Sequence, residues 1–204
     1  MRKISLANIF LQNPLTYWTY QRIVGGDRAR RYFIQKNVKP KQGLKILDIG
    51  CGPGNILEYL PEVNYYGVDI DQNYIDAANK KYKDKGVFEC SNLDEYAVSE
   101  PGSFDLVIAV GVIHHLNDDI AIKLFKIAKN ALRPDGHLMT FDGCYVDNQN
   151  YIARFLLKKD RGKFVRDRKK YEYLAKTSFS SIKTIIDETY FRVPYTSIIM
   201  ECCN

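Results

Sequence analysis

Apolar and polar residues follow two different periods along the chain, and together these periods predict a sheet covered by helices. Short, mostly apolar runs indicate buried strands, whereas an apolar residue at every third or fourth position indicates an amphipathic helix. The predicted strands are 44–49, 65–70, 86–91, 104–110 and 137–141. The helical windows between them are about 55–60, 72–84 and 118–132. Strands that alternate with helices predict a parallel sheet with helices on both faces.

The end of the chain departs from this rhythm. Two strand-like segments, 181–188 and 195–203, are separated only by a short loop around Pro194. Because a loop this short cannot carry a parallel crossover, the two segments are predicted to pair as an antiparallel hairpin. The expected fold class is therefore α/β, with a doubly wound, mostly parallel sheet and a C-terminal antiparallel hairpin.

The same pattern suggests how the chain is organised. Residues 1–43 are predicted to form an N-terminal helical cap. Residues 44–204 are expected to form one domain, in which about 143–180 is an insert between the fifth strand and the hairpin. A chain of 204 residues is long enough to bury a core of its own.

Composition narrows the class of protein. Hydrophobic residues make up 46% and charged residues 26% of the chain, as in ordinary globular proteins. Since no apolar run approaches the roughly 20 residues of a membrane span, no membrane partner is expected. The first residues make a poor signal peptide, because Ser5 and Asn8 break their apolar stretch. The five cysteines lack zinc-ligand spacing, so the prediction is a reduced, cytoplasmic protein without a metal.

The net charge of +6 is concentrated in one segment. Residues 158–170 contain eight basic and two acidic residues, which leaves 22 basic and 22 acidic residues elsewhere. Such a segment could hold an anionic small molecule through bidentate arginine contacts. It could also be an electrostatic footprint for nucleic acid, and a solvated helix end is the alternative to both.

The most informative motif follows the first predicted strand and reads Asp48-Ile49-Gly50-Cys51-Gly52-Pro53-Gly54. Glycine lacks a Cβ and tolerates φ > 0, so this turn lets a ligand lie directly against backbone. The segment that follows offers unpaired N–H groups to that ligand. A dinucleotide fingerprint would require a glycine where Asn55 stands, which argues against a nicotinamide enzyme.

An acidic residue ends the second predicted strand. Asp69 lies 19 residues after Gly50, close to the spacing of about 20 for a ribose-binding acid. A carboxylate at this place can accept hydrogen bonds from both ribose hydroxyls. The alternative role is helix capping, for which Asp71 is better placed because it immediately precedes the helical window.

The glycine turn resembles motif I of the class I S-adenosylmethionine (SAM) dependent methyltransferases, Asp-x-Gly-x-Gly-x-Gly, and the element order resembles their seven-stranded fold. The resemblance covers most of residues 44–142. Asp160-Arg161-Gly162-Lys163, with Arg192-Val193-Pro194-Tyr195, further resembles an uncharacterised bacterial subgroup. The resemblance implies an enzyme that uses SAM, releases S-adenosylhomocysteine and methylates a small, perhaps anionic, molecule.

The resemblance also implies roles for individual residues. Asp48, Gly50 and Val110 would meet the methionine part of SAM, and Asp69 would bind its ribose. Asn92 and Leu93 would face the adenine, although Asn92 could instead cap a short helix at 93–97. The implied cofactor-binding residues are Asp48, Gly50, Cys51, Gly52, Gly54, Asp69, Ile70, Asn92, Leu93 and Val110.

Two histidines follow the fourth predicted strand, and His114 and His115 are the catalytic candidates. In the family the second histidine of such a pair is often structural, so His114 is the preferred acceptor-side residue; a structural role for both is the alternative. Absence of an Asn/Asp-Pro-Pro-Tyr motif argues against a base or glutamine acceptor. An RNA methyltransferase that uses residues 158–170 and a non-catalytic SAM-binding protein remain alternatives, and the oligomeric state is left open.

Overall fold

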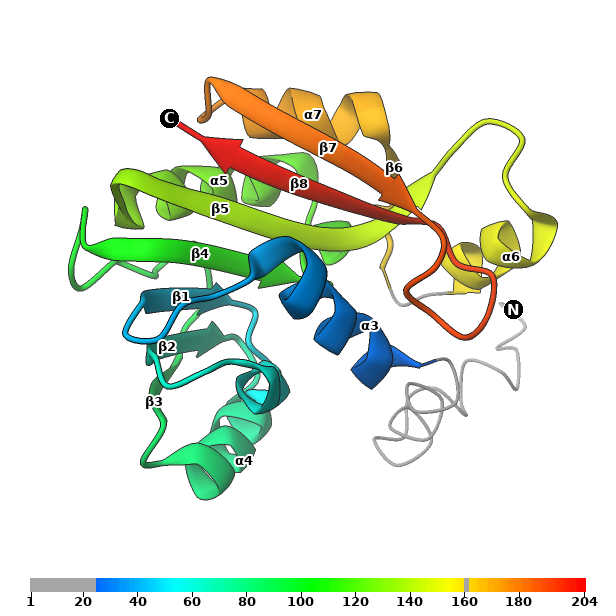
Figure 1. The fold of residues 1–204 in the computed structure, drawn as a ribbon. Coiled ribbons are helices and arrows are strands. Elements are labelled where there is room, and N and C mark those ends of the chain that lie inside the picture. Colours follow the sequence, from blue (N-terminus) through cyan, green and yellow to red (C-terminus); the bar gives the residue numbers. More distant parts are fainter. Residues whose placement is uncertain (1–24, 160–161) are drawn as a thin grey trace, which may run out of the picture.

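A single sheet forms the centre of the molecule, for which a computed structural model describes residues 25–159 and 162–204 (Figure 1). Its main path runs β3-β2-β1-β4-β5-β8-β7. These strands are β1 (Lys45–Ile49), β2 (Asn64–Asp69), β3 (Gly86–Cys90), β4 (Phe104–Val110), β5 (Leu132–Tyr145), β7 (Ser181–Asp187) and β8 (Ser197–Cys203). Strands β1 to β5 pair in parallel, whereas β8 is antiparallel to both β5 and β7. The α/β fold class and the C-terminal hairpin predicted from the sequence are therefore confirmed.

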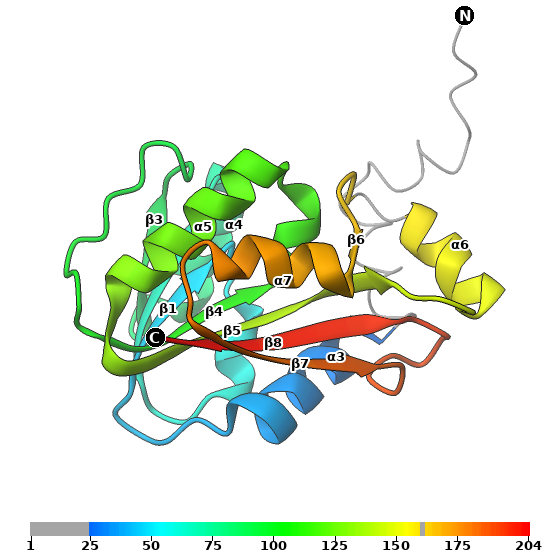
Figure 2. The same ribbon diagram turned by 90° about the horizontal axis from the view of Figure 1, so that it is seen from above.

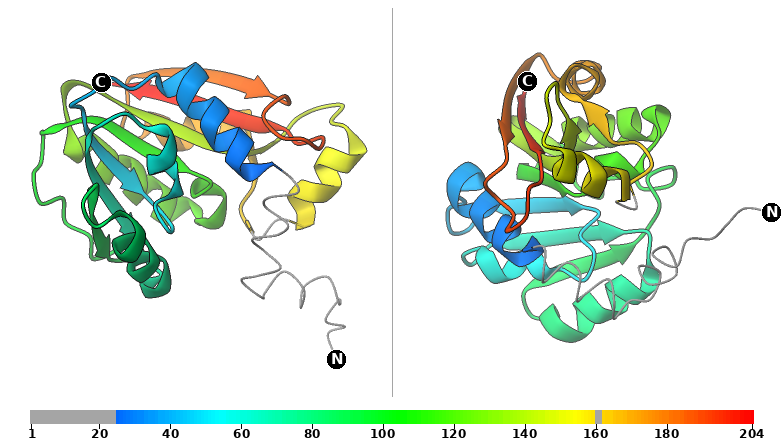
Figure 3. Two further views of the ribbon diagram at one scale, coloured as in Figure 1. Left: turned by 60° about the horizontal axis from the view of Figure 1, so that its bottom comes forward. Right: turned by 90° about the vertical axis from the view of Figure 1, so that its right-hand side faces the viewer.

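Helices cover both faces of the sheet (Figure 2). Helices α5 (Asp118–Ala131) and α7 (Arg168–Lys176) contribute Leu124 and Tyr171 to the core on one face. On the other face, α3 (Gly26–Phe33) and α4 (Gln72–Tyr82) contribute Phe33 and Ile75. Figure 3 shows α3 crossing the sheet beside β5 and β8, where the Phe33 ring lies 5.3 Å from that of Phe141.

Shorter elements connect these layers. The π-helix η1 (Ile34–Val38) extends α3, and the 3₁₀ helices η2 (Asn55–Tyr59) and η3 (Ile113–His115) follow β1 and β4. Helix α6 (Tyr151–Lys159) follows β5, and the two-residue strand β6 (Arg166–Asp167) pairs with the end of β5. All three helical windows predicted between the strands are therefore present, the first of them as a 3₁₀ helix.

Two sequence expectations need correction. Strand β5 extends well beyond the predicted 137–141, because Gly143 pairs with β8 and Tyr145 with β6. Residues 93–95 form a turn rather than the short helix expected at 93–97.

The division into a cap and a main domain stays a prediction. Residues 1–24 of the expected cap lie outside the described residues, while α3 and η1 occupy the later part of that range. In the described part of the chain, no helix has the length and apolar content that crossing a bilayer requires.

Candidate functional site

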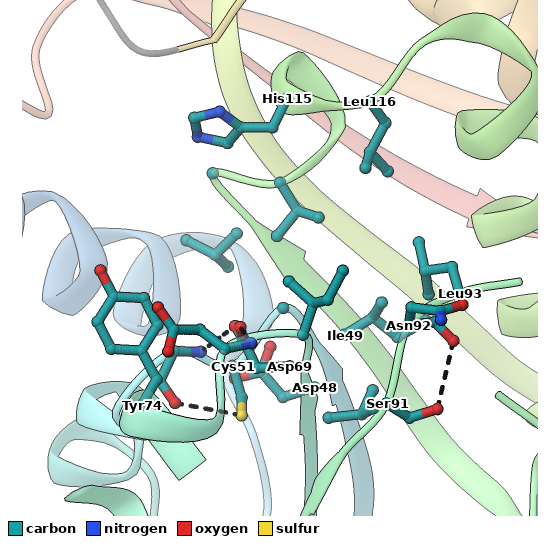
Figure 4. Close-up of a pocket in the computed structure, with 18 of the residues that line it drawn as sticks. Asp48, Ile49, Cys51, Asp69, Tyr74, Ser91, Asn92, Leu93, His115 and Leu116 are labelled. Carbon is teal, nitrogen blue, oxygen red and sulfur yellow. Dashed lines mark hydrogen bonds between the residues drawn. The ribbon is translucent and has the colours of Figure 1, made fainter. Parts of the chain in front are cut away.

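A cavity of about 660 Å³ opens at the carboxyl ends of β1 to β4 (Figure 4). It lies where the strand order reverses between β1 and β4, the point at which open α/β sheets bind ligands. The cavity is lined by Arg30, Asp48, Ile49, Gly50, Cys51, Gly52, Pro53, Asn55, Ile56, Val68, Asp69, Ile70, Asp71, Tyr74, Ser91, Asn92, Leu93, Asp94, Val110, Gly111, Val112, His115, Leu116 and Ile120. Apart from Gly54, every predicted cofactor-binding residue contributes to this lining.

The glycine turn forms one wall of the cavity in backbone conformations that favour glycine. The φ angles of Gly50, Gly52 and Gly54 are 76°, 54° and 72°. A Cβ on Gly50 would lie 2.4 Å from a Val112 methyl group, whereas a Cβ on Gly52 would meet no atom within 4 Å. The turn therefore packs against Val112, the residue before η3, at Gly50, and it leaves open space at Gly52. Gly54 instead packs near Phe88, below η2.

Asp69 joins the turn to the end of β2. Its Oδ2 atom accepts from the backbone N–H of Gly52 at 2.8 Å, and its Oδ1 atom accepts from Asp71 N–H at 2.9 Å. The helix cap is Asp71, as predicted, since its carboxylate accepts from Asn73 N–H at 2.9 Å. Asp69 is thus held in a fixed orientation at the cavity wall.

Asp48 is a buried carboxyl group beside the same turn. Its Oδ2 atom accepts from the Tyr65 hydroxyl at 2.6 Å, and only 2% of the residue is exposed. Its Oδ1 atom is buried and has no hydrogen-bond partner among the described residues. Burial raises the pKa of Asp48 to about 7, and the charge of Asp69 acts in the same direction. Asp48 Oδ1 therefore has unused hydrogen-bonding capacity.

Asn92 holds the backbone of the turn that follows it, although this turn is not the short helix considered for residues 93–97. Its side-chain oxygen accepts from the N–H groups of Asp94 and Glu95 at 2.8 and 3.0 Å. The predicted contact of Asn92 with adenine stays a prediction, and in the structure the side-chain oxygen binds the turn. Asn92 and Leu93 nevertheless line the cavity.

The histidine pair divides differently from the prediction. His114 is buried, and its Nδ1 atom lies 2.7 Å from Asp142 Oδ1. Gly162 packs so closely on the His114 ring that a Cβ there would lie 2.0 Å from the ring Cδ2. His115 lines the cavity, whereas His114 is not among the lining residues. Neighbouring residues of a 3₁₀ helix point about 120° apart, and the sequence does not show which one faces inward.

Figure 4 shows how the two sides of the cavity face one another. His115 and Leu116 lie on one side, and Asp48, Cys51 and Asp69 lie on the other. The rings of His114 and His115 are 4.2 Å apart, so the buried dyad with Asp142 packs directly behind the cavity-lining histidine.

Sequence reasoning missed Arg30, which reaches the cavity from α3. Its Nη1 atom contacts Asp27 Oδ1 at 2.9 Å. It is one of three arginines in this helix, at positions 28, 30 and 31, so nothing in the pattern marked it as the cavity residue.

In the described part of the basic segment 158–170, Arg166 is buried rather than exposed. The Arg166 guanidinium donates to the carbonyl oxygens of Ile113, Phe164 and Leu116, and to Asp118. It therefore ties the insert to the loop that carries His115. No group of His, Cys, Asp and Glu in residues 25–159 and 162–204 is arranged to hold a metal ion.

Comparison with known proteins gives one family match. A family model described as a methyltransferase domain matches residues 47–138. Phosphoethanolamine N-methyltransferase from Plasmodium falciparum is 29% identical over 136 residues, which are 64% of this chain and 50% of that protein. A ubiquinone biosynthesis O-methyltransferase from Idiomarina loihiensis is 30% identical over 115 residues, 54% of this chain and 46% of that protein. The chain thus spans about half the length of these two relatives.

A solved structure supports the fold. The TehB-like SAM-dependent methyltransferase from Corynebacterium glutamicum superposes with a TM-score of 0.67 at 20% identity, covering 95% of this chain and 97% of that one. Residues 47–138 thus match the methyltransferase family model, and the chain shares the fold of this solved methyltransferase structure.

Proposed function

We propose that the cavity binds SAM and that the chain transfers the methyl group to a small-molecule acceptor held on the His115 side. The observation that carries this proposal is one continuous cavity in which the glycine turn, Asp69 and His115 come together. The family match over residues 47–138 supports the same activity. When bound, SAM supplies a methyl group on a positively charged sulfur.

The charges along the cavity fit such a ligand. SAM carries a sulfonium, an ammonium and a carboxylate, so it needs more acidic than basic partners. Four carboxyl groups line the cavity, on Asp48, Asp69, Asp71 and Asp94, and Arg30 adds one guanidinium. The unpaired Oδ1 atom of Asp48 offers an acceptor for a cationic donor, and Arg30 offers a partner for the carboxylate.

The open face of the turn fits the adenosyl part. Since no atom lies within 4 Å of a Cβ built on Gly52, backbone there is accessible to a ligand. Asp69 is oriented by two N–H donors and retains lone pairs for ribose hydroxyls. Ile70 and Leu93 supply apolar lining for a base.

On the acceptor side, the chain's contribution is alignment, exclusion of water and control of a proton. We assign the proton-accepting role to His115, whose ring lines the cavity. His114 and Asp142 hold this turn from behind. The insert at about 143–180 belongs to the acceptor side in this proposal, because Gly162 packs against His114.

Two acceptor chemistries deserve the first trials. One relative is named a phosphoethanolamine N-methyltransferase, so phosphoethanolamine is a small anionic candidate. The other is named an O-methyltransferase, so a hydroxylated acceptor is the second. We also assign the protein to the reducing cytoplasm, in keeping with its five free cysteines.

Two measurements test the proposal. Isothermal titration calorimetry should show SAM and S-adenosylhomocysteine binding to the purified chain. Incubation with methyl-labelled SAM and a panel of small amines, phenols and phosphorylated amines should then transfer label to an acceptor. Absence of cofactor binding refutes the proposal, whereas binding without transfer to any acceptor supports a non-catalytic SAM-binding protein.

An RNA acceptor is the alternative to a small molecule. The burial of Arg166 and the pairing of Lys170 with Asp118 leave less free positive charge than the sequence of 158–170 suggests. A filter-binding titration discriminates, because RNA affinity that falls steeply with salt would favour an RNA methyltransferase.

A further inference from the structure

Helix α6 has two opposite apolar faces, of which only one is buried. Ala153 and Leu157 are 0% and 1% exposed and pack on the domain. Tyr151, Ile152 and Phe155 are 79%, 38% and 58% exposed. With about 3.6 residues per turn, these three side chains lie on the arc opposite Ala153 and Leu157. We refer to Tyr151, Ile152 and Phe155 as the outer face of α6.

Basic side chains accompany this outer face. Helix α6 carries Arg154, Lys158 and Lys159, all of them exposed, and it contains no acidic residue. Lys159 lies over the Phe155 ring, with Nζ 5.8 Å from its centroid. The exposed part of α6 is therefore both apolar and cationic, which is the composition of helices that lie in a membrane interface.

The outer face lies at the same end of the molecule as the cavity. Figures 1 and 2 show α6 at the carboxyl end of β5, apart from the helices that cover the sheet. Shortly after α6 ends, Gly162 packs on His114, whose neighbour His115 lines the cavity. A surface docked on α6 would thus lie next to the acceptor side.

We propose that the outer face of α6 docks on an anionic lipid surface. Apolar side chains would enter the interface while Arg154, Lys158 and Lys159 contact anionic headgroups. This inference does not depend on methyl transfer. It replaces the sequence expectation of no membrane partner with contact at the surface, without a membrane span.

Charge argues against two other occupants. In a twofold dimer the same patch faces itself, so the basic residues of two copies would repel each other. Residues 1–24 contain three basic and no acidic residues, so that segment offers no complementary charge. An anionic lipid surface satisfies both the apolar and the cationic character of the helix.

Co-sedimentation of the full chain with vesicles tests the proposal. Vesicles of phosphatidylcholine mixed with phosphatidylglycerol should bind the protein, and vesicles of phosphatidylcholine alone should bind it less. Phe155→Ser should weaken binding about tenfold, because the aromatic side chain that enters the lipid interface is lost. Lys158→Gln should weaken it about fivefold at low salt.

Tyr173→Ser is the matched control, because Tyr173 is an aromatic residue on α7 that is 62% exposed. It should bind vesicles like the wild type. All three variants should keep the wild-type melting temperature and affinity for S-adenosylhomocysteine. A variant that loses either property has a folding defect.

Three results would overturn the proposal. The first is wild-type protein that binds mixed vesicles no better than phosphatidylcholine alone. The second is an equal loss of binding in Phe155→Ser and Tyr173→Ser. The third is a wild-type dimer in light scattering that Phe155→Ser dissociates, since the outer face would then belong to a contact between two copies.

Discussion

The backbone N–H of Gly52 donates to Asp69 Oδ2 at 2.8 Å, and this bond fixes the glycine turn after β1 to the end of β2. Two features that are 17 residues apart in the sequence thereby become one wall of the cavity. The open side of the turn and the remaining lone pairs of the carboxylate face a shared space. The proposed adenosyl site depends on this relationship.

Removing the Asp69 carboxylate should weaken SAM binding. We expect Asp69→Ala to lower the affinity at least several-fold, because both the ribose acceptor and the anchor of Gly52 are lost. Calorimetry with SAM provides the measurement. Asp76→Ala is the control, since Asp76 is an exposed carboxylate on α4 outside the cavity. Equal affinity in the two variants would show that Asp69 does not contribute to the site.

Alanine substitutions at Gly52 and Gly50 should affect SAM affinity and stability differently. Gly52→Ala directs a methyl group into open cavity and should cost only about 1–2 kcal/mol of stability, from its φ of 54°. Its affinity for SAM should fall about tenfold or more, because the ligand must shift away from the backbone. Gly50→Ala should cost more stability, because its Cβ would lie 2.4 Å from a Val112 methyl group. Urea unfolding and calorimetry on both variants check this order, and unchanged SAM affinity in Gly52→Ala would contradict it.

The buried carboxyl of Asp48 should make stability depend on pH. Its pKa is about 7 in the fold, compared with the ordinary value of 3.8. Between these values the unfolded chain has lost the proton that the folded chain keeps, so this group makes the protein less stable as the pH rises from about 4 to 7. Asp48→Asn removes this dependence.

Urea unfolding at pH 5 and pH 8 provides the comparison. The unfolding free energy of Asp48→Asn, relative to the wild type, should increase from pH 5 to pH 8. A difference that stays constant between the two pH values would mean that Asp48 titrates in its ordinary range.

Arg166 should stabilise the loop that carries His115. Arg166→Ala removes the guanidinium donor from the carbonyl of Leu116 and one of the two donors from the carbonyl of Ile113, which keeps the Leu116 N–H, at a cost of about 1–3 kcal/mol. Arg168→Ala is the control, because its exposed pair with Glu172 is worth about 0.5 kcal/mol at most. Chemical denaturation compares the two variants. Equal unfolding free energies would contradict the structural role of Arg166.

The two histidines should respond differently to truncation. His114→Ala removes the ring partner of buried Asp142 and should destabilise the protein by about 1–3 kcal/mol. His115→Ala should change stability by less than about 0.5 kcal/mol, as is usual for an exposed residue. With the acceptor that the labelled-methyl assay identifies, His115→Ala should reduce turnover while SAM affinity is retained. Full turnover in His115→Ala would remove the proposed proton-accepting role.

The strands could be predicted from the sequence because a strand that is buried on both faces appears in it as a run of apolar residues. Strand β4 occupies the predicted range 104–110, where apolar residues face helices on both sides of the sheet. Asp69 and the glycine turn could also be predicted from the sequence, because their spacing is typical of a nucleoside-binding site. The helix expected at 93–97 is a turn because the Asn92 side chain bonds its backbone N–H groups and competes with helix formation.

Other parts of the site have no comparable pattern in the sequence. Arg30 and Arg166 belong to charged stretches, and only tertiary packing determines which arginine points inward. The choice between His114 and His115 depends on the rotation of a single 3₁₀ turn. Local periodicity does not report this rotation, because the element is three residues long.

A crystal structure with S-adenosylhomocysteine bound would show whether the cavity is the cofactor site. We expect ligand density in the cavity, with backbone at Gly52 against the nucleoside, the ribose hydroxyls at the Asp69 carboxylate and the sulfur toward His115. Density at another place, or a cavity that stays empty at saturating ligand, would contradict it.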